Sequence, residues 1–371
     1  MKTLRSLLRL NSGSDSVSIF EQLKRDNIPV IMWGAGNVAV HTMRTLQKKG
    51  IELSGIWVDG STSGELNGVP IRSYEQIAAQ FNKFNVVCGH SRFDLAEEAE
   101  QTRKEINRIF CSVNAFYEDS DIMTSEFIEE HYSEYERSFE LLEDDFSRQC
   151  FAAYMNCRNN DDYTMLLPCY VDLRTGGGAK ESYFHNPFFN AGDSEVYLDV
   201  GAYNGDSVRA FVEATGGKYR KILAVEPEQK NFAELEKYVR ESNLHDVELF
   251  RNGCSDENGI LTFTDDVDGE GFRANSQGTT QIEVRRIDQQ FASEEITLIK
   301  INLTMGPGTV KAIRGAEKIL QGKYPRMAIT PGLDERGLID IPQAVKQINP
   351  NIKLSLRYSF PMPARLLLFG Y

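Results

Sequence analysis

The sequence predicts an α/β protein with two parallel sheets, one in each half of the chain, and a helical segment between them. The chain has 371 residues, more than one hydrophobic core usually organises, so two domains are expected. Short β-branched runs alternate with amphipathic segments in residues 26–115 and again after residue 195, which is the pattern of βαβ units. The stretch between these regions has no clear strand pattern.

Composition restricts the classes of protein and partner. Hydrophobic residues make up 41% of the chain and charged residues 26%, as in globular proteins. There are 41 Lys and Arg against 54 Asp and Glu, a formal net charge of −13, which argues against nucleic acid or an anionic membrane as a partner. No apolar run approaches the roughly 20 residues that cross a bilayer. Six cysteines without a C-x-x-C pair are typical of reduced thiols, so a cytoplasmic location is expected.

The first half is expected to contain a helical segment at 1–25 and a domain at 26–115. Its strands are predicted at Val30–Trp33, Ser54–Val58, Val69–Ile71 and Asn85–Cys88, with a helix near Tyr74–Gln80. The first strand runs into Gly34-Ala35-Gly36-Asn37-Val38-Ala39, a match to G-x-G-x-x-G/A that makes the domain Rossmann-like.

Asp59 ends the second of these strands, where an acid can accept hydrogen bonds from ribose hydroxyls. Two alternatives stay open for this domain. Gly34, Gly36, Asn37 and Asp59 form a second nucleotide site for NAD or a nucleotide sugar, or the domain binds no ligand.

Residues 116–182 are expected to be a helical connector and a loop. Aromatic and apolar residues recur at helical spacing, as at Phe127, Tyr135 and Phe139, and the glycine-rich stretch 174–179 cannot hold regular structure. The aromatic residues are expected to form core or the surface of a homodimer.

Residues 183–371 repeat the alternating pattern. Strands are predicted at Val196–Val200, Lys221–Val225, Val247–Asn252, Thr297–Ile301 and Arg326–Thr330, and helices at Asp206–Glu213, Glu228–Glu241 and Thr309–Leu320. A terminal strand pair is predicted at Lys353–Arg357 and Leu366–Gly370, and an inserted hairpin at Ile260–Thr264 and Gln281–Arg285. The acidic run 264–270 lacks the spacing of a calcium loop, and no metal site is expected.

The glycine turn of the second domain differs from the first in its charge. Asp199 ends the strand, Asp206 opens the helix, and Gly201, Tyr203 and Gly205 lie between them. A pyrophosphate would be repelled here by roughly 4 kcal/mol for each close pair of charges. A ligand with an ammonium and a sulfonium group would be attracted, and S-adenosylmethionine (SAM) is such a ligand.

Two further strand ends follow in the order that a nucleotide site requires, which makes three with the glycine turn. Glu226 ends the next strand and is expected to accept from both ribose hydroxyls, and Asn231 lies in the helix after it. Ser255 and Asp256 follow the third strand, where polar groups can contact the adenine edge. These residues strengthen the prediction of a SAM site.

From about Tyr183 to the end, the sequence resembles the FkbM-type SAM-dependent methyltransferases. The likeness rests on Tyr183-Phe184, the turn from Val196 to Asp206, Val225-Glu226-Pro227 with Asn231, Ile282–Asp288, Leu298-Ile299-Lys300-Ile301 and Gly315-Ala316-Glu317. It implies a class I SAM-methyltransferase (Rossmann-like) sheet of seven strands, and the first domain resembles the smaller Rossmann-like module that precedes some members. It also implies O-methylation of a hydroxyl on a sugar, a glycan or a related small molecule.

The sequence departs from this family where the chemistry is expected. The family reads Lys-Ile-Asp-(Val/Ile)-Glu-Gly-Ala-Glu after the fourth strand, whereas here Asn302 replaces the acid, and Thr304 and Pro307 replace the glutamates. An amide orients a hydroxyl but does not take its proton. Asp334 is the candidate base instead, with Glu335 and His185 as further candidates, and Thr309 is expected to cap the next helix. The alternative is a SAM-binding protein with weak or lost activity.

Overall fold

The computed structural model describes residues 2–11, 19–60, 64–90, 92–114, 123–169, 183–184, 186–264, 273–274, 280–303, 306–322, 324–332, 334–358 and 365–371. The chain forms two compact units. The C-terminal unit comprises Met1–Leu7, Ile128–Ala153 and Pro168–Tyr371, and the N-terminal unit comprises Leu8–Phe127 and Tyr154–Leu167. The expected connector at 116–182 is therefore divided between the two units.

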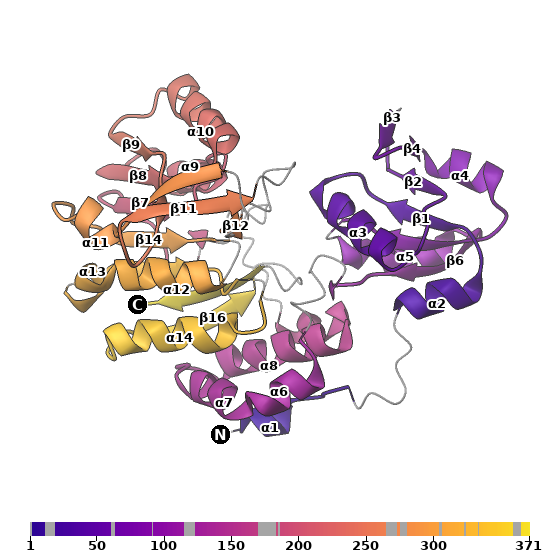
Figure 1. Cartoon of the computed structure of the whole chain (residues 1–371), viewed down its shortest axis with the longest axis horizontal. Coiled ribbons are helices and arrows are strands. Elements are labelled where there is room, and N and C mark those ends of the chain that lie inside the picture. Colours follow the sequence, from indigo (N-terminus) through magenta and orange to yellow (C-terminus); the bar gives the residue numbers. More distant parts are fainter. Residues whose placement is uncertain are drawn as a thin grey trace. The chain divides into compact units, whose positions relative to one another are not determined.

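The N-terminal unit contains a six-stranded sheet in the order β3-β4-β2-β1-β5-β6 (Figure 1). Its strands are β1 (Val30–Trp33), β2 (Gly55–Trp57), β3 (Gly64–Leu66), β4 (Val69–Arg72), β5 (Phe84–Cys88) and β6 (Ile106–Phe110). β3 runs antiparallel to β4, and the other neighbours are parallel, which confirms the expected sheet. β6 was not predicted, because two exposed polar residues, Asn107 and Arg108, interrupt its apolar pattern.

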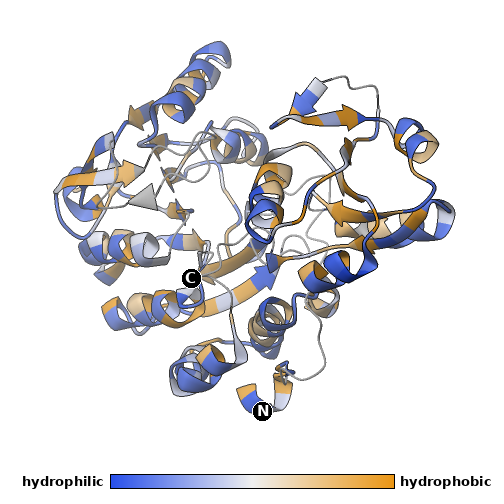
Figure 2. Cartoon of the chain, turned by 45° about the vertical axis from the view of Figure 1, so that its right-hand side comes forward, coloured by the Kyte–Doolittle hydropathy of each residue, from blue (hydrophilic) through white to orange (hydrophobic). Residues whose placement is uncertain are grey.

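Five short helical segments accompany this sheet: α2 (Ile19–Asp26), α3 (Asn37–Lys48), α4 (Tyr74–Gln80), η1 (Phe93–Leu95) and α5 (Ala96–Thr102). Leu23 of α2 and Leu46 of α3 pack with Val30, Val87 and Phe110 of the sheet in one buried cluster. In Figure 2 the strands carry mostly hydrophobic residues and the helices mix both kinds, as amphipathic helices on a sheet do.

The main sheet of the C-terminal unit has seven strands in the order β16-β17-β15-β14-β7-β8-β9 (Figure 1). They are β7 (Val196–Val200), β8 (Lys221–Val225), β9 (Val247–Phe250), β14 (Leu298–Ile301), β15 (Arg326–Ile329), β16 (Leu354–Tyr358) and β17 (Leu366–Gly370). β17 lies between β15 and β16 and is antiparallel to both, and the remaining neighbours are parallel. This is the seven-stranded class I methyltransferase sheet that the sequence predicted.

A second, smaller sheet has the order β10-β13-β11-β12. It consists of β10 (Gly253–Cys254), β11 (Gly259–Thr264), β12 (Arg273–Ala274) and β13 (Thr280–Arg285). β11 and β13 are antiparallel and confirm the predicted hairpin. Residues 265–270, which hold most of the acidic run, and residues 174–179 lie outside the described residues.

The helices of the C-terminal unit and of the segments shared with the other unit are α1 (Leu4–Leu7), α6 (Ser125–Glu130), α7 (Tyr132–Glu140), α8 (Asp145–Asn160), η4 (Tyr163–Cys169), α9 (Asp206–Ala214), α10 (Gln229–Glu241), α11 (Ile287–Gln290), α12 (Gly306–Gly315), α13 (Glu317–Gln321) and α14 (Gly337–Ile348). Figure 1 shows α14 beside α12, and α7 packs on α14 through the hydrogen bond from Ser138 Oγ to the Ile339 carbonyl, 3.0 Å. Among the described residues, no helix is both long and apolar enough to span a bilayer.

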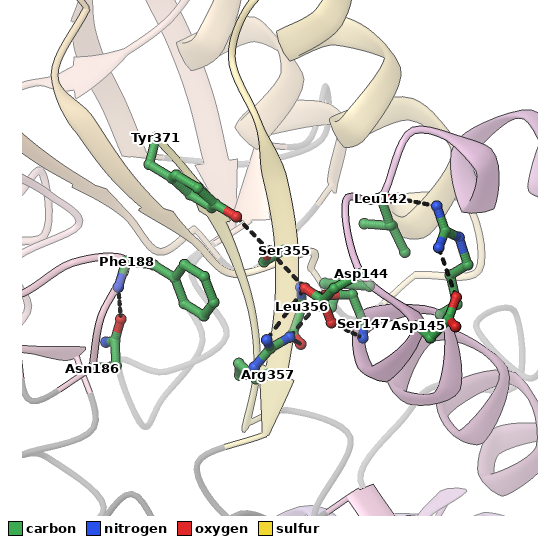
Figure 3. Close-up of polar contacts among 11 residues, drawn as sticks. Leu142, Asp144, Asp145, Ser147, Asn186, Phe188, Ser355, Leu356, Arg357 and Tyr371 are labelled. Atoms are coloured by element: carbon green, nitrogen blue, oxygen red, sulfur yellow. Dashed lines mark hydrogen bonds and ion pairs between the residues drawn. The ribbon is translucent and has the colours of Figure 1, made fainter.

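The segment between α7 and α8 covers the edge of this sheet (Figure 3). Glu143 N–H donates to the Leu354 carbonyl at 2.9 Å, and Leu356 N–H donates to Ser147 Oγ at 2.9 Å. Asp144 adds an ion pair with Arg357 at 3.2 Å. An exposed strand edge is a template for pairing with another chain, so this cover satisfies the backbone of β16 within the molecule.

Tyr135, Phe139 and Phe151 of the expected connector belong to the core, whereas Phe127 is only partly buried. Tyr135, Phe139 and Phe151 are each at most 3% exposed, and the last two meet edge to face at 5.8 Å between ring centroids. Their helical spacing therefore reflects packing within the chain, and it gives no support for a homodimer surface.

Candidate functional site

The glycine turn of the C-terminal unit joins β7 to α9 at the carboxyl edge of the sheet. The N–H groups of Gly201 and Ala202 both donate to the Val225 carbonyl at 3.0 Å, so the turn is fastened to the end of β8. Gly201 has φ +78, and a Cβ there would lie 2.2 Å from the Asn302 carbonyl oxygen. Glycine is required because the backbone of the turn and the tip of β14 approach each other this closely.

Asp199 lies beneath this turn, in an enclosed ion pair. It is fully buried, and its carboxylate accepts from Lys300 Nζ at 2.8 Å and from Ser207 Oγ at 2.5 Å. Lys300 also donates to the Gly201 carbonyl at 2.7 Å. The expectation that Asp199 presents an exposed negative charge to a ligand is therefore wrong, because Lys300 neutralises it; its observed role is to hold the turn.

The sequence contained a signal for Lys300 that the charge argument missed. It is a lysine in the otherwise apolar strand Leu298–Ile301, and the parallel register places it directly beside Asp199. Burial alone would lower the pKa of Lys300, but the neighbouring charges, that of Asp199 first, outweigh burial and raise it. The ammonium therefore stays charged.

Asp206 is the first residue of α9, directly after Gly205. The helix begins after Gly205, which has φ +86, and no side chain caps it there. The Asp206 carboxylate accepts a hydrogen bond from the Ser207 N–H at 2.8 Å. Asp206 lies in the first turn of α9, where the helix dipole stabilises a negative charge. Tyr203, between the two glycines, has φ +49. Asp206 is therefore an acidic side chain directly after the glycine turn.

Glu226, at the end of β8, is the best-placed acceptor beside the turn. It is 6% exposed, and its two oxygens accept from the N–H groups of Tyr203 and Glu228, both at 2.9 Å. Burial raises the pKa of Glu226 to about 6, against the opposing effects of these two hydrogen bonds and of the Lys300 charge. Each carboxylate oxygen has a further acceptor position, so two vicinal hydroxyls fit this group.

Asn231, Ser255 and Asp256 have their described partners outside the turn. Asn231 lies buried in α10, where its N–H donates to the capping carboxylate of Glu228 at 2.7 Å. Ser255 is buried and hydrogen-bonds Asp256 through its hydroxyl at 3.1 Å. A Cβ on Gly315 of α12 would lie 2.1 Å from the Ser255 carbonyl oxygen, so this segment packs on α12. Their contact with adenine stays a prediction.

The tip of β14 holds an exposed amide, and the nearby acid is already engaged. Asn302 is exposed, and its N–H donates to the Val200 carbonyl at 3.0 Å. Asp334 is 8% exposed and accepts from the N–H groups of Gly306 at 2.6 Å and Arg336 at 3.1 Å. Asp334 therefore caps α12, the function expected of Thr309, which is a buried residue inside that helix. Thr304 and His185 lie outside the described residues.

The N-terminal glycine turn is arranged differently from the dinucleotide site that its sequence pattern indicated. Trp33 stacks on Trp57 with ring centroids 4.2 Å apart, and the Arg103 guanidinium carbon lies 4.1 Å from the centroid of Trp57. Asp59 accepts from Trp33 Nε1 at 3.0 Å and pairs with Arg103 at 3.7 Å. The expected ribose acceptor is thus held by protein groups, and the stacked indoles occupy the ends of β1 and β2.

The other expected residues of this turn are Gly34, Gly36 and Asn37. Gly34 has φ +114, and a Cβ there would lie 2.8 Å from the Gly89 carbonyl oxygen. Gly36 precedes α3 in extended conformation, and no side chain caps the helix at this residue. The Asn37 side chain lies outside the described residues. Both alternatives, a second nucleotide site at this turn and a domain without a ligand, therefore stay predictions.

The residues of the C-terminal turn fit SAM by the chemistry of their donors and acceptors. The buried Glu226 carboxylate suits a ribose diol, Asp206 supplies negative charge for a cationic ligand, and the turn lies at the carboxyl edge where open α/β sheets bind ligands. No described group at this turn is a basic residue free to hold a phosphate, because Lys300 is buried in its ion pair.

Comparisons with known proteins agree with this geometry. A family model described as the methyltransferase FkbM domain matches residues 199–303. The crystal structure of a methyltransferase FkbM from Methylobacillus flagellatus KT has a TM-score of 0.69 and 18% identity, covering 98% of this chain and 95% of that one. No curated protein matches the chain.

Two further solved structures match about half of the chain at low TM-scores. An rRNA methylase from Streptococcus thermophilus has a TM-score of 0.31 and 15% identity, covering 52% of this chain and 90% of that one. Fibrillarin from Aeropyrum pernix, solved with natively bound S-adenosyl-L-methionine, has a TM-score of 0.31 and 10% identity, covering 48% and 68%.

The family match supports a methyltransferase with SAM as cofactor, and the likeness to the FkbM structure shows the fold over nearly the whole chain. The match of the family model to residues 199–303 confirms the sequence prediction for this stretch, which resembles the FkbM methyltransferase domain.

Proposed function

We propose that the C-terminal unit transfers a methyl group from SAM to a hydroxyl oxygen of a sugar, a glycan or a related small molecule. The observation that carries the proposal is the buried Glu226 carboxylate beside a glycine turn whose backbone is fixed at both strand ends. When bound, the cofactor supplies a methyl group on a positively charged sulfur, which is the electrophile of the reaction.

The residues of this chain have separate tasks in that proposal. Glu226 accepts hydrogen bonds from the two ribose hydroxyls, and Asp206 favours the cationic amino-acid part of the ligand electrostatically. Lys300 and Asp199 hold the turn in place through their ion pair and the hydrogen bond from Lys300 to the Gly201 carbonyl. They are therefore positioning residues rather than ligand contacts. The acceptor hydroxyl is expected near Asn302, whose exposed amide orients it.

The reaction also requires removal of the proton from the acceptor hydroxyl. A positioned base is worth about 10²–10⁴-fold in rate. Asn302 cannot accept the proton as an amide, and the Asp334 oxygens already accept two backbone N–H groups. Methyl transfer in this protein therefore depends on an acceptor that gives up its proton readily, on a residue outside the described part, or on solvent.

The amide of Asn302, in place of an acid at the tip of β14, favours a second candidate function, a SAM-binding protein with little or no transferase activity. It keeps the cofactor turn and Glu226 but lacks an acid at the tip of β14. The two functions share cofactor binding and differ only in turnover.

Calorimetric titration of the full chain with SAM, S-adenosylhomocysteine and NAD tests the shared part. We expect SAM and S-adenosylhomocysteine to bind and NAD not to bind. Binding of NAD without binding of the other two would contradict the proposal. Glu226→Gln should weaken binding, whereas Glu228→Gln is the matched control, because that carboxylate bonds the N–H groups of Lys230 and Asn231 in α10. A panel of sugar and small-molecule acceptors then separates the two candidates: methylated product supports the transferase, and none supports the binding protein.

A further inference from the structure

Two cysteines of the N-terminal unit lie at the ends of neighbouring strands. Cys88 is the last residue of β5, and Cys111 follows β6 directly. The strands are parallel with Val87 paired to Phe110, so the two cysteines are the next pair in the same register. Their Sγ atoms are 3.2 Å apart.

This placement meets the geometric requirement of a disulfide before any bond forms. Disulfide-linked residues have Cα atoms about 4.4–6.8 Å apart and sulfurs about 2 Å apart. Adjacent strands are spaced about 4.8 Å apart, within that range. Bond formation then requires the sulfurs to approach by roughly 1 Å, which side-chain rotation provides without a change of register.

We propose that Cys88 and Cys111 form a reversible disulfide when the protein is exposed to a peroxide. This modification site is independent of the proposed methyltransferase function, because both cysteines belong to the N-terminal unit.

The two sulfurs have different roles because their exposure differs. Cys88 is 1% exposed, whereas Cys111 is half-buried and is the sulfur that the oxidant reaches. The hydrogen bond with Cys111, followed by burial, raises the pKa of Cys88, so this thiol stays protonated and acts second.

The chemistry balances with the peroxide as the only oxidant. The Cys111 thiolate attacks one peroxide oxygen, the O–O bond breaks, and a sulfenic acid and hydroxide form. The Cys88 sulfur then attacks the sulfenic sulfur, the S–S bond forms and the oxygen leaves as water. In total, two thiols give two electrons to hydrogen peroxide and yield one disulfide and two waters, and a dithiol reverses the reaction.

The bond would tie β6 to the centre of the sheet beside the N-terminal glycine turn. Gly89, next to Cys88, donates its N–H to the Trp33 carbonyl at 2.7 Å, and its own carbonyl lies against Gly34. The loop closed by the bond contains α5. Oxidation is therefore expected to stabilise the N-terminal unit against local opening of this helix.

A second pair of neighbouring thiols makes a control variant necessary. Cys150 and Cys169 are hydrogen-bonded to each other in the C-terminal unit, so total thiol loss cannot identify the bond. The double variant Cys150→Ser/Cys169→Ser removes that pair and leaves the proposed one.

The experiment treats the full chain with hydrogen peroxide, alkylates the remaining thiols, digests without reductant and identifies linked peptides by mass spectrometry. We expect one linked pair containing Cys88 and Cys111, lighter by two hydrogens than the sum of its peptides, in the wild type and in the double variant. Dithiothreitol should remove it, and Cys88→Ser should leave Cys111 as a sulfenic or higher acid. Oxidation of Cys111 in the wild type without the linked pair, or full alkylation of both cysteines after peroxide, would overturn the proposal.

Discussion

Cofactor affinity should fall as the pH is lowered through 6, because Glu226 accepts the ribose hydroxyls only as a carboxylate. Burial raises its pKa to about 6, so the group is about 90% ionised at pH 7 and about 10% at pH 5. If the ionised form alone binds, the association constant for S-adenosylhomocysteine drops about 10-fold between these pH values, or about 1.4 kcal/mol. Calorimetry at pH 5, 6 and 7 measures this slope.

The raised pKa of Glu226 also affects the stability of the fold, and this stability changes with pH in the opposite direction to the cofactor affinity. The pKa of Glu226 is higher in the folded chain, about 6 against 4.5, so the folded state binds the proton more tightly. This group therefore contributes about 2 kcal/mol of stability below pH 4.5, which is lost as the pH rises through 6. Glu226→Gln should weaken cofactor binding at pH 7, and it should also lower the melting temperature slightly, because the amide has only one oxygen to accept the N–H groups of Tyr203 and Glu228.

The control Glu228→Gln should keep a pH dependence of the same size, displaced slightly to lower pH, because its carboxylate caps α10 and its charge is the smallest of the influences on the pKa of Glu226. A wild-type affinity that stays constant from pH 7 to pH 5, or a Glu226→Gln variant with the wild-type slope, would refute the assignment of Glu226.

Three further predictions concern the turn and the tip of β14. Gly201→Ala should abolish cofactor binding in titrations, because its Cβ would lie 2.2 Å from the Asn302 carbonyl oxygen; wild-type affinity would contradict this close approach. Asp199→Asn should lower the free energy of unfolding in urea by about 3–5 kcal/mol, since it leaves the buried Lys300 charge uncompensated, and Asp199→Asn/Lys300→Met should recover part of it; equal losses in both variants would contradict the ion-pair account. Asn302→Asp should raise the rate of methylation of a responsive acceptor by about 10²-fold if a base at this tip is what the chain lacks; an unchanged rate would place the base elsewhere.

Much of the fold was readable from the sequence because buried parallel strands are apolar and short. Val196–Val200 and Lys221–Val225 were predicted to the residue. The elements that were missed lack that contrast. β6 alternates buried and exposed residues irregularly, and α14 contains Pro342, a residue that usually interrupts a helix.

The site was predictable in its residues but not in their contacts. The position of Glu226 followed from strand order alone, because parallel strands end at one edge of the sheet. The environment of Asp199 did not, since its partner Lys300 lies 101 residues away in sequence and is adjacent only through the pairing of β7 with β14. A charge counted along the sequence therefore overstated the negative field at the turn.

This correction changes the physical reason for preferring SAM to a dinucleotide, although the preference stays. With Asp199 neutralised, Asp206 and the ionised Glu226 remain as the negative groups that hydrogen-bond backbone N–H groups of the turn and of the first residues of α9. The discrimination against a pyrophosphate then depends on these two carboxylates and on the absence, among the described groups at this turn, of a cation free to bind phosphate. Neutralising Asp206 should consequently relax the selectivity, whereas neutralising Asp199 should only destabilise the fold. Titration of Asp206→Asn and Asp199→Asn with S-adenosylhomocysteine and NAD distinguishes these two effects, and equal loss of selectivity in both variants would restore the simpler charge argument.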